Sequence, residues 1–356
     1  MTSMSEPEGG APAPVAVADP RARPTMKNVA ALAGVGIKTV SRVINGEPNV
    51  SAVTTARVRA AADSLDFHPD LHARNLRRAD GRSSTLGLLV GSVGNPFSGA
   101  MHRAIEDLAS TRGVAVFASS LDDDPDREEV AVSAFLRRRV DGLILTTVSK
   151  SQGYLLPELR RGTPLVFVDR EPAGVEADVV VSDNAAGAAA ATRHLLSFGH
   201  RRIAFLGDRT DIQTAQERRR GFLEELGRAG VATADIPVIT GLHDEDAANR
   251  ALIALLESEH PPTAVFSSQN LITIGAVRGL RELGLHRTIA LVGFDDVPLA
   301  DLLEPGITVV AQNPSEIGRL AAERIFARLD GDRSAGRTYV VPTELITRGS
   351  GEMRPK

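Results

Sequence analysis

Cysteine is absent from the 356 residues of this chain. A fold held by disulfides and a metal site built from thiolates are therefore excluded. Long apolar runs are missing too, and no segment approaches the length needed to span a bilayer. Residues 1–24 are rich in Pro, Ala, Gly and acids, without a basic start or an apolar segment. This composition argues against a secretory signal and predicts a disordered N-terminal tail in a cytoplasmic protein.

Several motifs of common enzymes are also missing. The chain has no glycine-rich motif for a dinucleotide or for nucleotide phosphates, and no G-x-S-x-G motif. The acidic run DDDPD at 122–126 raises the question of a divalent cation. It lacks the glycine and the later glutamate of a calcium loop, so a solvated turn before a helix is the favoured interpretation. We expect neither a metal nor a cofactor.

The charge of the chain is unevenly distributed. The whole sequence has a formal charge of −4. Residues 21–82 nevertheless carry 11 basic and five acidic side chains, a balance of +6, whereas residues 83–356 have a balance of −7. A basic N-terminal segment on an acidic body indicates a local contact with a polyanion.

The segment that follows the tail predicts three short helices. Their apolar spacing places them at about 26–33, 37–45 and 52–65, and Thr25 and Ser51 are suitable N-caps. Gly34 can adopt the positive φ of a tight turn between the first two. Val53, Val58 and Leu65 are among the residues available for packing in the third. The pattern is a helix–turn–helix with a supporting helix over residues 25–68, followed by a basic linker or hinge helix over 69–82.

From residue 84 onwards, apolar strand-like runs alternate with amphipathic helical segments. The runs lie at 85–91, 114–120, 142–147, 164–169, 179–183, 202–207, 236–240, 263–268 and 288–294. Nearly continuous apolar strands separated by helices are typical of doubly wound parallel sheets. Nine strands are many for one sheet, so we predict two α/β lobes with a break near 180–185. Loops at the carboxyl ends of the strands would line a cleft between them.

The second predicted helix has an outer side unlike that of an ordinary surface helix. Val40, Val43 and Ile44 face inwards. The other side carries what we call the reading face, namely Lys38, Thr39, Ser41, Arg42 and Asn45. Side chains of this kind reach base edges and phosphates in the major groove of DNA. The alternative is a three-helix bundle with a solvated polar face, but the local charge of +6 favours DNA binding.

These residues resemble a known family. The pattern VA-LAGV---TVSRV-N, followed by VS--T---V, resembles the headpiece of the lactose-repressor (LacI/GalR) family of bacterial transcription regulators. In the body, NPF (95–97), VDG (140–142), VDR (168–170), DN (183–184), HLLSFGHRRIAFLG (194–207), GFDD (293–296) and PTELITRGS (342–350) are similar to the family's periplasmic-binding-protein-like core. The resemblance covers about residues 25–350. It implies two lobes in residues 83–350, one of about 83–181 plus 311–328 and one of 182–310 plus 329–350.

The resemblance also implies a set of DNA-binding residues. These are Thr25, Ile37, the five residues of the reading face, and Ala73 and Leu76 in the linker. Ile37 is apolar, so its contact would be with a thymine methyl group. Gly36 departs from the family's usual Ser and removes one hydroxyl contact to phosphate. Leu76 matches the family's leucine that is wedged into the minor groove, and by itself it could equally pack against the body.

For the cleft, the resemblance implies a small-molecule effector, in this family often a sugar. The matching residues are Asn95, Phe97, Asp169, Arg170, Arg218, Gln269 and Asp295. Carboxylates, arginines and amides suit a sugar's hydroxyls, and an aromatic ring suits its C–H face. Each has a plainer interpretation: the aspartates could cap helices, and Arg218 in ERRR (217–220) could lie on a solvated face. Gln269 stands where many relatives have Asn, and Ser98 stands where they often have an aromatic residue.

The leading hypothesis is therefore a ligand-controlled repressor that binds a palindromic operator as a homodimer and is not an enzyme. A glycoside hydrolase would need two carboxylates about a scissile bond, and Asp295 and Asp296 are only sequence neighbours. A transport binding protein is disfavoured by the missing secretory signal and by the additional headpiece. The ligand itself and the direction of its effect stay open at this point.

Overall fold

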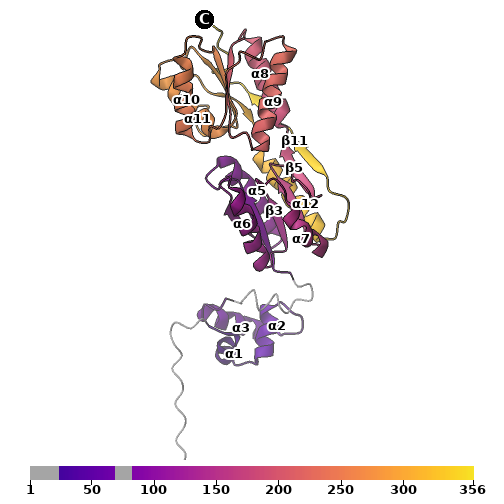
Figure 1. Cartoon of the computed structure of the whole chain (residues 1–356). Coiled ribbons are helices and arrows are strands. Elements are labelled where there is room, and N and C mark those ends of the chain that lie inside the picture. The colour runs from indigo at the N-terminus through magenta and orange to yellow at the C-terminus, as the bar shows by residue number, and fades with distance from the viewer. Residues whose placement is uncertain (1–23, 69–81) are drawn as a thin grey trace, which may run out of the picture. The chain divides into compact units, whose positions relative to one another are not determined.

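The computed structural model describes residues 24–68 and 82–356 (Figure 1), which belong to two compact units, Met1–Gly81 and Arg82–Lys356. Most of the predicted tail and of the predicted hinge, including Ala73 and Leu76, lies outside the described residues. Within the described part of the chain, no helix is long and apolar enough to cross a membrane.

The first unit contains the three predicted helices. They are α1 (Met26–Ala33), α2 (Ile37–Ile44) and α3 (Ala52–Ser64). Gly34 has a φ of 60° and ends α1, while the side chain of Ser51 accepts a hydrogen bond from the amide of Thr54 and begins α3. Val29, Val40 and Val58, one from each helix, have no exposed surface and form the centre of a small core. The all-α headpiece is confirmed.

One packing prediction in this unit is wrong. Val53 was expected to be available for the core, but 78% of it is exposed. The helix turns Val58 and Ala61 inwards together with Ala62, and Val53 falls on the opposite side. Phe67, beyond the end of α3, packs against the core instead.

The second unit contains two six-stranded sheets, and each is the centre of one lobe. The first sheet has the strand order β11-β5-β4-β3-β1-β2 and is parallel throughout. Its strands are β1 (Thr85–Val90), β2 (Ala115–Ser120), β3 (Gly142–Leu145), β4 (Leu165–Val168), β5 (Asp178–Ser182) and β11 (Thr338–Val341). Every strand predicted before residue 185 is therefore confirmed.

The second sheet has the order β12-β10-β9-β8-β6-β7, with only β12 antiparallel to its neighbour. Its strands are β6 (Ile203–Leu206), β7 (Val238–Ile239), β8 (Ala264–Ser267), β9 (Ala290–Phe294), β10 (Thr308–Ala311) and β12 (Glu344–Ile346). The predicted two-lobed, doubly wound fold is confirmed, although β10, β11 and β12 were not among the predicted strands.

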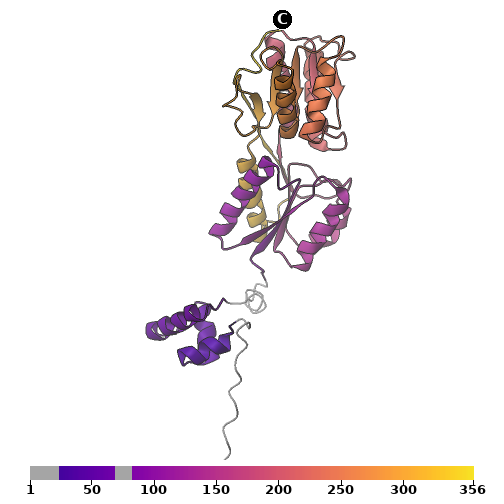
Figure 2. The ribbon, with the colours of Figure 1, turned by 90° about the vertical axis from the view of Figure 1, so that its left-hand side faces the viewer.

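Helices cover both faces of each sheet, as Figure 2 shows for the first lobe and Figure 1 for the second. In the first lobe α5 (Pro96–Thr111) and α12 (Pro314–Leu329) pack on one face, and α6 (Pro125–Arg137) packs on the other, near α7 (Leu156–Arg161). In the second lobe α8 (Asn184–Ser197) and α9 (Gln213–Arg228) share one face, and α10 (Glu245–Leu256) and α11 (Asn270–Glu282) share the other. Successive residues of a strand point to opposite faces of its sheet. Apolar side chains therefore fill the space beneath the helices on both faces.

The chain crosses between the lobes three times, at 182–184, 311–314 and 341–344. The predicted division of the lobes is wrong at its last step. Residues 329–350 were assigned to the second lobe, but β11 pairs with β5 in the first sheet, and only β12 belongs to the second. A short strand at a sheet edge carries little apolar signal, so its partner cannot be inferred from its own sequence.

Candidate functional site

The exposed side of α2 is the first candidate site. Val40 and Val43 are buried beneath the helix, while Lys38, Arg42 and Asn45 are exposed and Thr39 and Ser41 are half-exposed. The five residues of the reading face therefore lie on the accessible side of a helix whose other side is fixed in a core. Among the described residues, Arg42 makes one long ionic contact, 3.8 Å from Glu47, and both side chains are at least half exposed. Its guanidinium thus keeps most of its donors available.

The start of α2 is also accessible. Gly36 is its N-cap, and Ile37, the first helical residue, is 45% exposed although it is apolar. Thr25 stands at the N-terminus of α1, where its amide and its hydroxyl both contact Oδ1 of Asn28, at 2.9 and 2.5 Å. The N-termini of α1 and α2 therefore present backbone amides and short polar side chains, a combination that suits phosphate oxygens.

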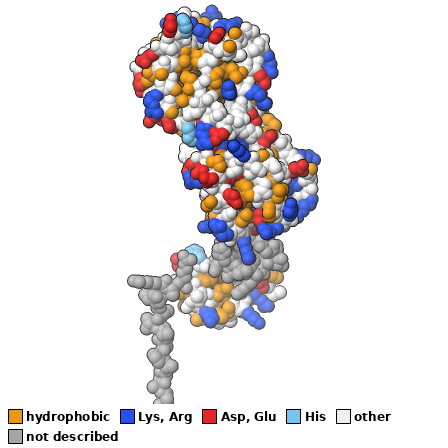
Figure 3. Space-filling view, in the orientation of Figure 1, with side chains coloured by type: hydrophobic (Ala, Val, Ile, Leu, Met, Phe, Trp, Pro, Cys, Tyr) orange, Lys and Arg blue, Asp and Glu red, His pale blue; other side chains and the backbone are white. Residues whose placement is uncertain are grey.

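The second candidate site is a cleft of about 370 Å³ between the lobes of the body. Its walls are loops that follow strands in both sheets. Asn95 and Phe97 follow β1, Asp169 and Arg170 follow β4, and the second lobe contributes Arg218 from α9, Gln269 after β8 and Asp295 after β9. The structure thus brings all seven predicted effector residues together around one cavity, and Figure 3 shows charged side chains gathered at this junction.

Arg218 is fixed in place by its surroundings. Its Nε donates to Oδ1 of Asn184 and its Nη1 to the carbonyl of Ser268, both at 2.8 Å, and its guanidinium lies 3.9 Å from the centroid of the Phe294 ring. Only 5% of the residue is exposed. The alternative of a solvated face fits its neighbours Arg219 and Arg220, which are exposed, but not Arg218. The arginine is therefore preorganised at the cleft.

Two strand-end aspartates have the same unusual backbone. Asp169 has a φ of 68° and Asp295 a φ of 71°, in the left-handed region that non-glycine residues seldom adopt. Each amide donates to the neighbouring strand, Asp169 to Val180 and Asp295 to Val310. The turn directs both side chains to the cleft, and Gln312 donates to the Asp295 carboxylate at 2.6 Å. Neither aspartate caps a helix here, so the alternative interpretation as caps does not apply.

Burial raises the pKa of the Asp169 carboxyl, and the negative charges of Asp295 and Asp123 add to the rise, while Arg170 and Arg218 oppose it. Arg170 itself donates to Asp123 at 2.7 Å and lies 3.6 Å from Asp169. The cleft is therefore a mixed-charge site in which carboxylates accept hydrogen bonds and guanidinium groups donate them.

Sequence reasoning missed several residues of this cleft. Asp122 and Asp123 line it. DDDPD forms the expected turn before α6, in which Asp122 is exposed, but Asp123 is half-buried at the cleft, so a fully solvated turn does not describe Asp123. Asp208 and His243 also line it, and Asp208 accepts hydrogen bonds from His243 and from Gln269, each at 3.1 Å. Their position in the sequence could have identified the acids, because they directly follow the strands β2 and β6. Among the described residues, no group of His, Asp and Glu could hold a metal ion.

Some of the polar atoms at the cleft are buried without a hydrogen-bond partner among the described residues. They include Oγ1 of Thr146 and Oε1 of Gln312. Buried polar atoms in native proteins are nearly always hydrogen-bonded. Unpartnered ones that line a cavity are available to water or to a polar ligand.

Three hydrogen bonds join the lobes around the cleft. Asn270 donates to the Asn95 side chain at 2.7 Å, the amide of Glu171 donates to Gln213 at 2.8 Å, and Arg209 donates to the carbonyl of Asp123 at 3.1 Å. These contacts depend on the relative position of the lobes. A ligand that changes that position would have to break or strengthen them.

The carboxylate neighbours Asp295 and Asp296 point to different surroundings. Asp296 pairs with Arg348 through two contacts of 2.6 and 2.7 Å and is not among the residues that line the cleft. The two do not form a carboxylate pair across one substrate.

Comparison with known proteins adds independent findings. Residues 25–70 match the family described as bacterial regulatory proteins, lacI family, and residues 192–351 match a periplasmic binding protein-like domain. The chain is 35% identical to the HTH-type transcriptional regulator PtxS of Pseudomonas aeruginosa, over 94% of this chain and 97% of that one.

Two solved structures are similar over nearly the whole length. The lac repressor dimer bound to operator and the anti-inducer ONPF has a TM-score of 0.82 and 25% identity, covering 93% of this chain and 99% of that one. A complex of the transcriptional regulator CelR with cellobiose has a TM-score of 0.65 and 32% identity, covering 92% and 100%. The chain therefore belongs to the lacI family of bacterial regulatory proteins and is a transcriptional regulator.

Proposed function

We propose that this protein is a repressor that binds a palindromic operator as a homodimer and is controlled by a sugar in the cleft between its lobes. The observation that carries the proposal is the pairing of two preorganised sites in one chain. One is the exposed reading face on a helix pinned by the fully buried Val40, and the other is a cavity lined by strand-end carboxylates and arginines. The protein would act in the cytoplasm, on the nucleoid.

The reading face supplies the chemistry of sequence recognition. Arg42 and Lys38 suit the O6 and N7 acceptors of guanine, Asn45 suits adenine, and Ile37 suits the methyl group of thymine. Thr25 at the start of α1 would contact the phosphate backbone and fix the register. In this proposal Ala73 and Leu76 act in the minor groove at the operator's centre.

Support for a homodimer comes from exposed apolar side chains on both lobes. Phe117, on the edge strand β2, is 47% exposed, and Leu302 in the second lobe is 73% exposed. Contiguous apolar patches mark interfaces, whereas single exposed apolar residues are common, so these two side chains are candidate contact positions only. The similar lac repressor is a dimer on its operator, which agrees with a second copy as the partner.

Support for a sugar comes from the chemistry of the cleft. Asp169 and Asp295 accept hydrogen bonds from hydroxyls, Arg170 and Arg218 donate them, and the half-buried Phe97 offers an aromatic face. The related CelR binds cellobiose, a sugar. We propose that the cleft binds such a ligand without turning it over.

The first experiment is to map where the native protein binds on its genome and to footprint the best site. We expect a palindrome with a central C-G step beside sugar transport or catabolic genes. Absence of any enriched palindrome, with ligand binding retained, would contradict the assignment of the reading face.

The footprinted operator then allows a test of Arg42. Arg42→Ala should weaken operator binding about 5–150-fold in fluorescence anisotropy, because one bidentate base contact contributes about 1–3 kcal/mol. Effector affinity should stay unchanged. Arg59→Ala is the matched control, since Arg59 is exposed on α3 away from the reading face. Equal losses in both variants would mean that α2 carries no special role.

A further inference from the structure

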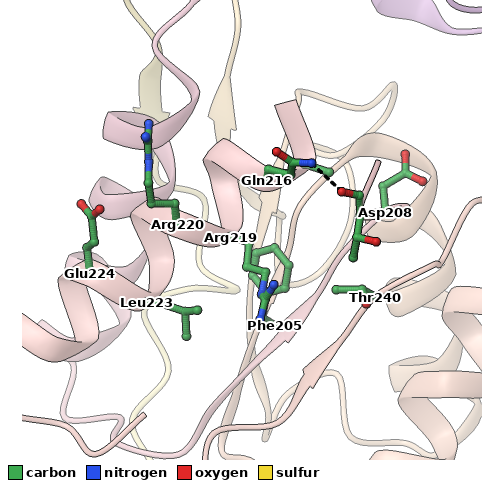
Figure 4. A pocket seen from close by; sticks show the side chains of 10 residues that line it. Phe205, Asp208, Gln216, Arg219, Arg220, Leu223, Glu224 and Thr240 are labelled. Carbon is green, nitrogen blue, oxygen red and sulfur yellow. Dashed lines mark hydrogen bonds between the residues drawn. The ribbon is translucent and has the colours of Figure 1, made fainter. Parts of the chain in front are cut away.

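The second lobe has another cavity, of about 480 Å³, on the side of α9 that faces away from the buried Arg218. We call it the outer pocket. It lies between α9 and the ends of β6 and β7, and Figure 4 shows its side chains. Its lining residues are Phe205, Asp208, Thr210, Ala215, Gln216, Arg219, Arg220, Leu223, Glu224 and Thr240. The volume is in the range of pockets that hold small organic molecules.

The floor of the outer pocket is apolar and rigid. The Phe205 ring packs against the rings of Phe222 and Phe266, with centroids 5.2 and 5.7 Å away. Gly207 leaves the space that this ring occupies, since a Cβ there would lie 2.3 Å from Phe205 Cε1. Ala215 and Leu223 add apolar surface from one side of α9. A flat apolar group could therefore rest on a preformed floor.

The rim of the outer pocket carries two arginines that form no hydrogen bond or ion pair within the described part of the chain, although the charge of Arg220 acts on the nearby Glu217. Among the four arginines of α9, Arg218 and Arg228 form hydrogen bonds, but Arg219 and Arg220 form no hydrogen bond or ion pair with any described residue. Arg219 and Phe205 line the same pocket, and Figure 4 shows Arg220 extending from α9 away from the Phe205 ring. A guanidinium beside an apolar floor is suited to an anion carried on an apolar body.

The acids of the outer pocket are already engaged. Asp208 accepts hydrogen bonds from His243 and Gln269 at 3.1 Å, on its cleft side, and from the amide of Arg209 at 2.7 Å. Glu224 lies 3.5 Å from Arg228. The unpaired charge of the pocket is therefore positive, although the numbers of acids and arginines are equal.

We propose that the outer pocket binds a small organic anion, one with a carboxylate, sulfonate or phosphate group attached to an apolar body. Arg219 and Arg220 would attract the anionic group, and Ala215 and Leu223, which lie over the buried Phe205 ring, would contact the apolar part. Gln216, which holds the loop by donating to the carbonyl of Thr210 at 2.6 Å, keeps the wall of the pocket in place. The outer pocket shares one lining residue, Asp208, with the effector cleft, and its existence does not depend on the proposed function.

The test uses 8-anilinonaphthalene-1-sulfonate, a fluorescent sulfonate with an apolar body, titrated into the full chain. We expect saturable binding that the double variant Arg219→Ala/Arg220→Ala weakens about tenfold or more, because it removes charge-assisted hydrogen bonds. Arg250→Ala is the matched control, since Arg250 is exposed on α10 of the same lobe. Circular dichroism should be unchanged in both variants, as all three arginines are on the surface.

Two further measurements locate the probe and define its class. Ala215→Phe should block binding by filling the floor, whereas Asp295→Asn in the cleft should leave it intact. The neutral analogue N-phenyl-1-naphthylamine should bind more weakly than the sulfonate to the wild-type chain. Equal binding by the double variant, or sensitivity to Asp295→Asn instead, would overturn the site. Equal affinity for the neutral analogue would overturn the assignment to an anion.

Discussion

The two lobes of the body share one topology but are stabilised differently. Their strand orders correspond one to one, so that β1, β4 and β5 of the first sheet match β6, β9 and β10 of the second. The second lobe has an aromatic layer in which Phe205, Phe222 and Phe266 contact one another at 5.2–6.0 Å. The first lobe instead has a mainly aliphatic layer and, at the start of β5, a buried ion cluster.

That ion cluster is centred on Asp178, which has no exposed surface. Its carboxylate accepts hydrogen bonds from Arg324 and Arg328 of α12, at 2.8–3.1 Å, and from the amide of Arg337 before β11. One side chain thus connects the strand that leaves the first lobe with the helix and strand that return to it. The second lobe also joins distant segments by polar contacts, such as those of Glu352 with His194 and Thr308 at 2.6 and 3.0 Å, and adds the ring packing that the described residues of the first lobe lack.

What the lobes keep in common is the position of the ligand-facing aspartates. Asp169 after β4 and Asp295 after β9 occupy matching places, with nearly equal φ angles and matching hydrogen bonds to the adjacent strand. The residues that follow differ, since Arg170 faces the cleft and Asp296 pairs with Arg348. Equivalent backbone positions therefore place the site, and the neighbouring side chains make its two halves chemically distinct.

The largest losses of stability are expected from substitutions at the centre of each lobe. Asp178→Asn should lower the free energy of unfolding by about 3–5 kcal/mol, because two arginines lose the partner of a buried charge. Phe222→Ala should cost a similar amount by leaving a cavity among the rings. Urea unfolding monitored by circular dichroism measures both. Asp246→Asn, an exposed acid on α10, is the control and should change stability by less than about 0.5 kcal/mol.

If Asp178→Asn proved nearly neutral while Phe222→Ala did not, the first lobe would depend on its aliphatic core alone. The two lobes would then differ in the contacts they contain, but the ion cluster would contribute little to stability.

The fold was predictable where apolar runs were long. All nine predicted strand runs contain strands, because buried parallel strands are apolar on both faces. The strands that were missed are short or lie near an edge: β11 reads Thr-Tyr-Val-Val, and Val340 is 58% exposed. Nothing local in such a segment says which sheet it joins, since its register depends on residues about 160 positions away.

The cleft was predictable through residues at strand ends and through the family resemblance. Asp123, Asp208 and His243 were not predicted as cleft residues, because their role depends on partners that are distant in the sequence. Asp123 matters through its hydrogen bond to Arg170, 47 positions away, and Asp208 through Gln269, 61 positions away. Arg218 could not be separated from Arg219 and Arg220 by sequence spacing, because only the packing of α9 decides which arginine is buried.

A smaller loss of stability is expected in both lobes at glycines where two helices are in close contact. Gly318 of α12 lies against α5, where an added Cβ would be 2.4 Å from the carbonyl of Met101. Gly221 of α9 lies against α8, where it would be 2.1 Å from the carbonyl of Ala185. Gly318→Ala and Gly221→Ala should each cost about 1–3 kcal/mol, since the paired helices must separate.

Gly227, near the end of α9, provides the matched control. A Cβ there meets nothing within 4 Å, so Gly227→Ala should be neutral or stabilising by up to about 1 kcal/mol. Thermal unfolding of the three variants would compare them directly. A loss for Gly227→Ala equal to the other two would mean that helix propensity and packing distance play no part in the difference.

The matching aspartates give the next comparison. Asp295→Asn should weaken binding of the effector sugar about 10–100-fold, because an amide replaces a charged acceptor. Asp169→Asn should have a smaller effect, since burial and nearby acids already raise the pKa of Asp169 and so disfavour its charged form. Isothermal titration with the identified sugar measures both, and operator affinity without sugar should be retained.

Asp296→Asn is the control for this pair, because Asp296 pairs with Arg348 outside the cleft. An effect of Asp296→Asn on sugar affinity as large as that of Asp295→Asn would contradict the assignment of the strand-end aspartates as ligand contacts.

The smallest expected effect is the acid sensitivity of the first lobe. Burial by itself would raise the pKa of Asp178, but hydrogen bonds from Arg328 and the charge of Arg324 hold it below its usual value. A lowered folded pKa contributes stability above the unfolded value of about 3.9, and this contribution is lost as the pH falls through the folded pKa. The stability difference between wild type and Asp178→Asn should therefore be constant from pH 7 to about 5 and shrink below about 4. Urea unfolding of both proteins across this range measures it. A difference that stayed constant down to pH 3 would mean that the geometry of the cluster, and not the charge of Asp178, joins the segments of the first lobe.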